Sequence, residues 1–303
     1  MSIFQKLFIS LAYSVGYRLL NSSDNLPSGS TVTSYNSIKA NNNEWYADPF
    51  CFEHEERIYI FMEVKNVWRG PAYIGAVEII NGKAQKVTKA LAEPFHISYP
   101  NLFKFKNSIY MLPETSAVSQ LRLYKAISFP LKWELDAILL EGVKYADCSF
   151  LFNGHDIFLF CYNTENEIND LIIYNLDMNK KALTPVWFDK TKVVNHRPAG
   201  NLFKHGDAVY RPLQECTFSY GEKLHLCKMK QDPSQGYNEY LYDTILHSNI
   251  KLEDGIKYSR IHTLNRSRQM EVVDAGFDKF YLNKIIWRLY NELKNISSGI
   301  LDG

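Results

Sequence analysis

The sequence of 303 residues has almost no charge excess, with 34 lysines and arginines against 33 acidic residues and a formal charge of +1. Proteins that wrap nucleic acid carry a strongly basic face, so this balance argues against a nucleic-acid partner. A neutral or locally charged ligand is favoured instead. Length alone permits one large domain or two ordinary ones.

The cysteine patterns of metal sites and disulfide frameworks are also missing. The five cysteines are an odd number and none stands in CxxC spacing. Structural zinc sites use closely spaced ligand pairs, and disulfide-rich folds use even numbers of cysteines. We therefore expect a reducing, cytoplasmic environment and no required cofactor. A divalent ion held by Asp48, Asp147 and Glu215 with a diphosphate stays open.

No uninterrupted apolar run opens the chain, because Lys6 and Arg18 interrupt the first twenty residues, and no small-residue cleavage site follows. This segment has the features of neither a signal peptide nor a membrane span. Apolar residues near helical spacing over 3–19 and 277–293 predict amphipathic helices in segments 1–25 and 276–303, on either side of a domain over 26–275. Such helices could touch the inner face of a membrane, although packing against the domain is favoured.

An internal repeat is the most informative feature that is present. Four segments share a hairpin pattern whose closing aromatics are separated by 51, 48 and 52 residues; these are Tyr59, Tyr110, Phe158 and Tyr210. A period near fifty with a recurrent hairpin is typical of propeller blades. The 14% aromatic content also suits all-β structure. Residues 220–274 contain material for a further blade, closed by a strand from residues 30–40.

The predicted fold class is therefore all-β, a five-bladed β-propeller with short amphipathic helices at the N- and C-termini. A β-sandwich is the alternative for many short strands, but it would not explain the regular spacing.

Polar residues at the start of each repeat are expected on the innermost strands, which converge on the propeller axis. They predict that Asp48, Asn101, Asp147 and Arg197 lie around one central cleft. Two carboxylates delivered from different blades suit glycosidic chemistry, because one acid and one base must act with different pKa values. For either aspartate alone, a turn or strand-start role is the alternative.

These strands carry a family resemblance. Ala47-Asp-Pro-Phe, Ser98-Tyr-Pro-Asn and Tyr145-Ala-Asp-Cys-Ser-Phe resemble the first three blades of the hydrolases grouped around glycoside hydrolase family 43. The resemblance implies a general base at Asp48 and an acid-tuning carboxylate at Asp147. The general acid of that family, a Glu opening the fourth blade, falls where this chain has His196-Arg197-Pro198.

A closer resemblance covers about residues 45–275. Its stretches include Pro94-Phe-His-Ile-Ser-Tyr-Pro, Ile109-Tyr-Met-Leu-Pro-Glu, Arg197-Pro-Ala-Gly and Gln214-Glu-Cys. They are similar to the N-terminal domain of the plant glucosamine inositolphosphorylceramide transferases and their bacterial relatives. In the plant proteins a second domain follows that can itself carry the transferase activity.

The resemblance implies glycosyl transfer in glycan or glycolipid assembly, and the basic residues expected in the cleft favour a phosphate-activated sugar donor, such as a nucleotide sugar. The arginine fork suits phosphate, so Arg197 and Arg211 are expected to clamp the donor, unless they pair with carboxylates in a buried network. The predicted catalytic residues are Asp48, Asp147 and Glu215. The predicted substrate-binding residues are His96, Tyr99, Asn101, Glu114, Arg197, Arg211, Gln214 and His262. A non-catalytic carbohydrate-binding propeller and a glycoside hydrolase are the alternatives.

The cysteine spacing generates a first testable prediction. Purified protein should contain no stoichiometric zinc when its metal content is measured by atomic emission. Zinc held by the cysteines at one equivalent would contradict this.

Overall fold

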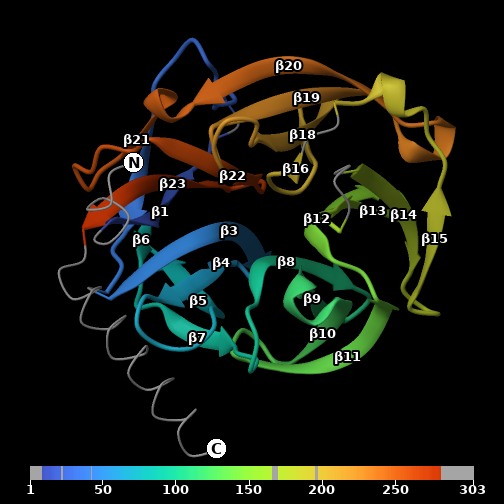
Figure 1. The fold of residues 1–303 in the computed structure, drawn as a ribbon, viewed down its shortest axis with the longest axis horizontal. Helices are drawn as coiled ribbons and strands as arrows, with labels where there is room; N and C mark the ends of the chain where they lie inside the picture. Colours follow the sequence, from blue (N-terminus) through green and yellow to red (C-terminus); the bar gives the residue numbers. More distant parts are fainter. Residues whose placement is uncertain (1–8, 22, 42, 166–169, 195–196, 281–303) are drawn as a thin grey trace, which may run out of the picture.

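The computed structural model describes residues 9–21, 23–41, 43–165, 170–194 and 197–280. Five sheets stand around a common centre (Figure 1), which confirms the predicted all-β five-bladed propeller. We number the sheets as blades I to V in the order of their innermost strands.

The strands of the blades follow. Blade I contains β3 (Glu44–His54), β4 (Arg57–Asn66), β5 (Tyr73–Ile80), β6 (Lys83–Ala84) and β7 (Thr88–Leu91). Blade II contains β8 (Ser98–Phe105), β9 (Ser108–Glu114), β10 (Gln120–Ser128) and β11 (Lys132–Glu141). Blade III contains β12 (Tyr145–Asn153), β13 (Asp156–Asn163), β14 (Asp170–Asp177) and β15 (Ala182–Val186). Blade IV contains β16 (Arg197–Pro198), β17 (Phe203–His205), β18 (Ala208–Glu215), β19 (Lys223–Gln231) and β20 (Asn238–Leu246). Blade V contains β1 (Ile9–Leu19), β2 (Thr33–Ile38), β21 (Ile250–Leu252), β22 (Arg260–Arg266) and β23 (Met270–Phe280). Short 3-10 turns occur at η1 (Ser116–Val118), η2 (Lys190–Lys192), η3 (Pro233–Gln235) and η4 (His247–Asn249).

The repeated hairpins form the two inner strands of blades I to IV. Phe52 pairs with Tyr59, and Phe203 pairs with Tyr210, each directly opposite its partner. Facing blades then bury their aromatic side chains against each other, as where Phe103 of blade II meets Phe150 of blade III with 4.8 Å between ring centroids. Blades therefore depend on their neighbours for burial.

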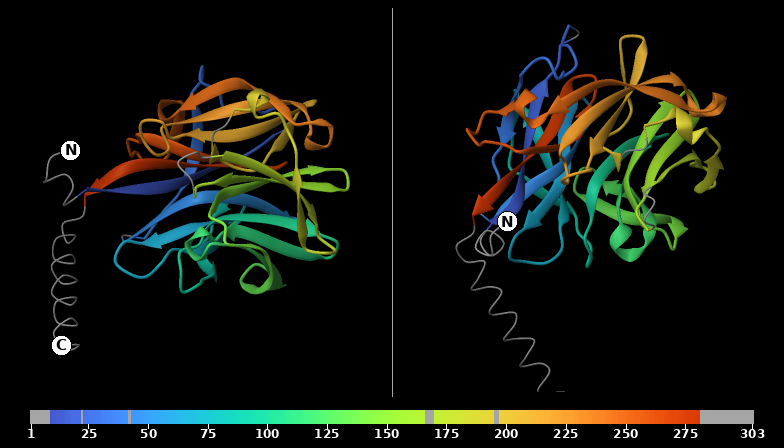
Figure 2. Two further views of the ribbon diagram at one scale, coloured as in Figure 1. Left: turned by 45° about the vertical axis from the view of Figure 1, so that its right-hand side comes forward. Right: turned by 45° about the horizontal axis from the view of Figure 1, so that its top comes forward.

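Blade V differs in part from its prediction. A strand from residues 30–40 does join it, as β2. Residues 223–231 do not, because they form β19 of blade IV. The hairpin at β17 and β18 supplies only the inner strands of blade IV, so the next two strands of the chain complete that sheet. Blade V instead takes strands from both ends of the chain (Figure 2).

The predicted N-terminal helix is wrong from Ile9 onward, where the chain forms β1. This strand lies between β2 and β23, and consecutive residues such as Ala12, Tyr13 and Ser14 are all at least nine-tenths buried. A strand buried on both faces does not alternate between apolar and polar residues. The apolar residues of β1 therefore fell near the spacing expected of an amphipathic helix. The predicted C-terminal helix begins inside β23, at Phe277, and otherwise lies outside the described residues. No helix in the described part of the chain is long and apolar enough to cross a membrane.

The placement of β1 generates a second prediction. Val15 is fully buried, whereas Leu19, at the end of the same strand, is 46% exposed. Val15→Asp should lower the free energy of unfolding in urea by more than about 3 kcal/mol, because it buries an unpaired charge. Leu19→Asp should change that free energy by less than about 0.5 kcal/mol. Equal losses of unfolding free energy in the two variants would favour an amphipathic helix, in which Val15 and Leu19 lie on one face.

Candidate functional site

The innermost strands bend at equivalent positions, and the bends aim side chains at the axis. Pairing with the second strand is interrupted after Ala47 in β3, after Ser98 in β8 and after Ala146 in β12. The next residue has a left-handed φ in each case, with 50° at Asp48, 49° at Tyr99 and 49° at Asp147. Such values are uncommon outside glycine and mark bulges that redirect side chains. Both aspartates therefore lie inside strands rather than opening turns.

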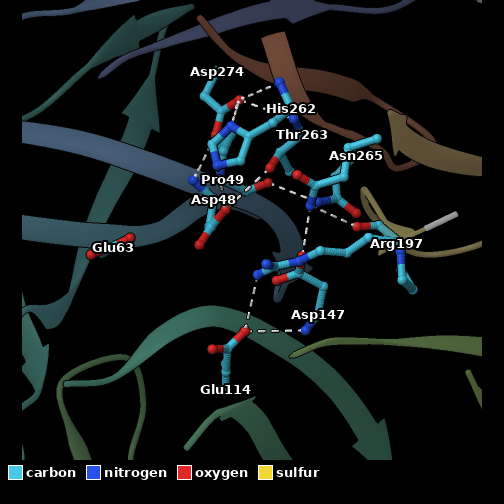
Figure 3. Close-up of polar contacts among 12 residues, drawn as sticks. Asp48, Pro49, Glu63, Glu114, Asp147, Arg197, His262, Thr263, Asn265 and Asp274 are labelled. Atoms are coloured by element: carbon cyan, nitrogen blue, oxygen red, sulfur yellow. Dashed lines mark hydrogen bonds and ion pairs between the residues drawn. The ribbon is translucent and has the colours of Figure 1, made fainter. Parts of the chain in front are cut away.

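Asp48 and Asp274 flank the ring of His262. The His262 Nδ1 atom is 2.7 Å from Asp274 Oδ1, and Nε2 is 3.3 Å from Asp48 Oδ1 (Figure 3). Asp274 also accepts backbone hydrogen bonds from Asp48 at 2.9 Å and Thr263 at 2.9 Å, and the Thr263 hydroxyl donates to Asp48 at 3.2 Å. These contacts join blade V to blade I.

Charge sets the protonation of this group. Burial raises the pKa of Asp48, but His262, Arg197 and Thr263 outweigh it and leave that pKa below its ordinary value. Burial lowers the pKa of His262, but Asp274 and neighbouring groups reverse the effect and raise it well above its ordinary value. At neutral pH the group therefore contains a carboxylate at Asp48 beside an imidazolium.

Asp147 lies in a second group, with Arg197, Glu114 and Gln214. Its Oδ2 atom accepts hydrogen bonds from Arg197 Nε and, at 2.7 Å, from Gln214 Nε2. The Glu114 Oε2 atom is 3.5 Å from the guanidinium of Arg197 and accepts from the backbone of Asp147 at 3.2 Å. Burial raises the pKa of Asp147 to about 7 against the opposing effect of Arg197.

We call Asp48, Glu114, Asp147, Arg197, His262 and Asp274 the axial cluster. Its two groups interact, because Arg197 lowers the pKa of Asp48. Tyr220 contacts both: its ring lies 5.5 Å from the Arg197 guanidinium and 5.2 Å from the His262 ring. The side chain of Arg197 is 24% exposed and that of Glu114 is 13% exposed, so the cluster reaches solvent at these residues.

Arg211 does not belong to the cluster, which corrects its predicted role in an anion clamp. Its side chain is fully buried, pairs with Glu239 through two nitrogens and donates to the Val194 carbonyl at 2.8 Å. Gln214, which contacts Asp147, is three residues further along β18. Residues an odd number apart point to opposite faces of a strand, so Arg211 faces away from the axis. Arg211 instead forms a buried ion pair, which was the alternative to the clamp.

Glu215 also points away from Asp147. Its carboxylate lies 2.7 Å from His225 and 3.2 Å from Lys223. Burial raises the pKa of Glu215, but these two partners prevail and lower it to about 2. A group ionised at neutral pH is poorly suited to donate a proton. The predicted ion site of Asp48, Asp147 and Glu215 is therefore not assembled.

Two further predicted residues are buried and contact residues outside the axial cluster. Tyr99 is 1% exposed and bonds to the Ser149 hydroxyl at 2.7 Å. Asn101 is fully buried and exchanges hydrogen bonds with Asn201 at 2.6 and 2.7 Å. Their contacts join blades II, III and IV. His96 differs from these two buried residues, because its side chain is 46% exposed.

Sequence reasoning missed Glu63 and Asp274 as site residues. Each is a lone acid within an apolar strand segment, Phe61–Val64 and Val272–Ala275. That pattern is a usable signal, because a buried acid needs a partner or a function. Asp48, His262 and Asp274 also place one potential metal-ligand atom each within 4.8 Å of one another. Their mutual contacts use those atoms, which fits an ion triad better than a cation site.

Comparison with solved structures concerns the fold first. Among solved structures, the catalytic domain of the Coprinopsis cinerea GH62 α-L-arabinofuranosidase aligns with a TM-score of 0.56 over 76% of this chain and 90% of that one, at 10% identity. Zg3597, a family 117 glycoside hydrolase from Zobellia galactanivorans, aligns with a TM-score of 0.55 over 90% and 91%, at 12% identity. These similarities concern the fold alone.

The family is shown by sequence. The profile described as "Glucosamine inositolphosphorylceramide transferase 1, N-terminal" matches residues 20–274, and the chain belongs to this family. Glucosamine inositolphosphorylceramide transferase 1 of Oryza sativa subsp. indica is 31% identical over 204 residues, 64% of this chain and 27% of the relative. The Arabidopsis thaliana protein of that name is 28% identical over 209 residues, 64% of this chain and 26% of the relative. The chain therefore matches only about a quarter of these relatives' length.

The raised pKa of Asp147 generates a third prediction. The folded state keeps a proton on Asp147 up to about pH 7, whereas the ordinary value is 3.8. Asp147 therefore adds stability at acid pH, and this contribution is lost as pH rises through about 7. Between about pH 4 and 7 the wild type should lose up to about 4 kcal/mol relative to Asp147→Asn in urea unfolding.

Asp177 provides the control, because the backbone N–H of Lys180 lowers its pKa. Asp177→Asn should give a difference of opposite sign, and an Asp147→Asn difference that is flat with pH would show that Asp147 is ionised throughout.

Proposed function

We propose that the axial cluster transfers a sugar from a phosphate-activated donor to an acceptor hydroxyl in glycan or glycolipid assembly. The observation that carries this proposal is the pair of carboxyls, Asp48 and Asp147, held near Arg197 on facing strands with pKa values shifted in opposite directions. Separation of two carboxyl pKa values is how glycosyl-transferring sites divide acid and base roles.

Asp48 is the base in this proposal. It is ionised at neutral pH and its carboxylate is oriented by Thr263 and His262. The proton of the acceptor hydroxyl would pass to Asp48 as the hydroxyl oxygen attacks the anomeric carbon. Before that transfer, imidazolium at His262 stabilises the Asp48 carboxylate beside it.

Arg197 is the donor-binding group. Its Nε atom donates a hydrogen bond to Asp147, whereas its nitrogen facing Glu114 is 3.5 Å from the carboxylate. A donor phosphate could replace the Glu114 contact while Asp147 keeps the guanidinium in place. Because Arg211 is engaged elsewhere, the clamp contains one arginine.

The name of the family supports transfer, but the relatives are much longer than the matched region. A non-catalytic carbohydrate-binding domain is therefore the second candidate. The burial of Asp48 and Asp147, at 6% and 2% exposure, favours it, because little of either carboxyl is open to a reacting group. The hydrolase alternative rests on fold similarity and on the blade motifs that resemble family 43, but the general acid of that family is replaced by His196-Arg197-Pro198 and fold does not define activity.

A fourth prediction separates these roles. With a panel of nucleoside-diphosphate sugars as donors, Arg197→Ala should weaken donor binding ten- to a hundredfold in calorimetry, since it removes one charge-assisted contact worth about 1.5–3 kcal/mol. Asp48→Asn should lower kcat and leave donor affinity nearly unchanged, because the base acts as the acceptor proton leaves. Arg57→Ala, at an arginine that is 65% exposed in blade I, is the control and should change neither quantity.

Different results would redirect the assignment. Binding of neutral oligosaccharides equally by wild type and Asp48→Asn, with no binding of phosphorylated donors, would establish the recognition role. Release of free sugar from a neutral glycan would establish hydrolysis.

A further inference from the structure

A third carboxyl, that of Glu63, lies beside Asp48 and has no role in the network described above. Glu63 is on β4, opposite Ala47 of β3, and is 5% exposed. Its Oε1 atom is buried and has no hydrogen-bond partner among the described residues. Figure 3 draws no contact between this carboxyl and the cluster.

The surroundings of Glu63 keep its proton in place. Burial raises its pKa well above the ordinary value, and the charges of Asp48 and Glu114 act in the same direction. His262 and Lys65 oppose these effects without reversing them. The raised pKa favours the neutral acid, which can donate the hydrogen bond that ionised Asp48 cannot.

His96 connects this buried acid with solvent. Its Nε2 atom is 3.5 Å from Glu63 Oε1, while its side chain is 46% exposed. Burial lowers the pKa of His96, and Lys65 acts in the same direction, against Glu114 and Asp48. A neutral imidazole between a buried acid and water can pass a proton in either direction.

The other axial carboxyl with a raised pKa, that of Asp147, is already bound to Arg197 and Gln214. A departing phosphate would face this group together with Asp48 and Glu114, and Arg197 is already shared between Asp147 and Glu114. Among the described residues no second arginine pairs with these carboxyls, and Arg211 is bound to Glu239. Protonation would neutralise the developing charge that Arg197 alone has to offset.

We propose that Glu63 is the proton donor of the axial site and that His96 is its route to solvent. This inference rests on the proposed transfer function. The acceptor oxygen bonds to the anomeric carbon and its proton goes to Asp48. The bond from that carbon to the phosphate oxygen breaks, its electron pair stays on the oxygen, and the Glu63 proton follows it. Glu63 regains a proton from water through His96, and Asp48 releases its own.

A purely structural Glu63 is the competing explanation. An acid buried only for packing would gain from a hydrogen bond on each oxygen, and the unbonded Oε1 atom lacks one. A glutamine or apolar residue would fill the same space without that cost. An oxygen left unbonded in the free protein is instead ready for a ligand.

The first experiment tests the proton without requiring activity. Infrared difference spectra of wild type minus Glu63→Gln at neutral pH should contain the C=O stretch of a protonated carboxyl. Glu78→Gln, at a partly exposed acid on β5 of the same blade, is the matched control and should not remove that band. Absence of the band from the Glu63 difference spectrum would overturn the proposal.

The second experiment tests the role in turnover, with the nucleoside-diphosphate sugar that the wild-type protein uses. Glu63→Gln should lower kcat by about 10²–10⁴-fold with donor affinity nearly unchanged. It should also remove the decline of kcat at alkaline pH, because that decline reports loss of the Glu63 proton. Unchanged kcat and pH profile, with Asp48→Asn inactive, would overturn the role of Glu63 and leave transfer standing.

The third experiment tests the route through His96. His96→Gly should lower kcat, and added imidazole should restore it. His54→Gly removes another histidine, which lies 3.5 Å from the exposed Glu55, and should show neither effect. Loss of turnover that imidazole does not restore would remove His96 from the route. If wild type turns over no donor of the panel, the transfer function and the donor role fail together, even with the carboxyl band present.

Discussion

The carboxylate of Asp274 is the constraint on which the site depends. It is fully buried and accepts hydrogen bonds from the bulges of two blades, from Asp48 in blade I and from His262 and Thr263 in blade V. A buried carboxylate is stable only when such donors satisfy it. Its position therefore fixes the angle between the two blades and, with it, the spacing of Asp48 and His262.

Charge pairing across the axis also explains why the two aspartates behave differently at equivalent places in the fold. Both follow the same bend and both are buried, but Asp48 faces an imidazolium and a hydroxyl. Burial raises the pKa of Asp147, Arg197 lowers it, and Glu114, which shares that guanidinium, raises it further. The blades supply identical geometry, and the neighbours from other blades supply the chemical difference.

The fold could be predicted from the sequence because the repeat consists of residue pairs close in sequence, such as Phe52 and Tyr59, that lie within one blade. Prediction from the sequence placed Asp48, Asp147 and Arg197 near the axis for the same reason. It failed where the outcome depends on distant strands: β1 is buried by strands from both ends of the chain, and its pattern imitated a helix. The prediction for Arg211 failed because its partner, Glu239, lies on another strand. The face of the strand on which Arg211 lies depends on the register of that strand, which the sequence does not show.

Closure of the ring through blade V has a consequence for synthesis of the chain. Strand β1 leaves the ribosome first, yet its long pairing is with β23, which is made some 250 residues later. Until then one edge of an apolar strand stands without its partner, and unpaired edges are where chains associate wrongly. The ring of blades is therefore closed only once β23 has paired with β1.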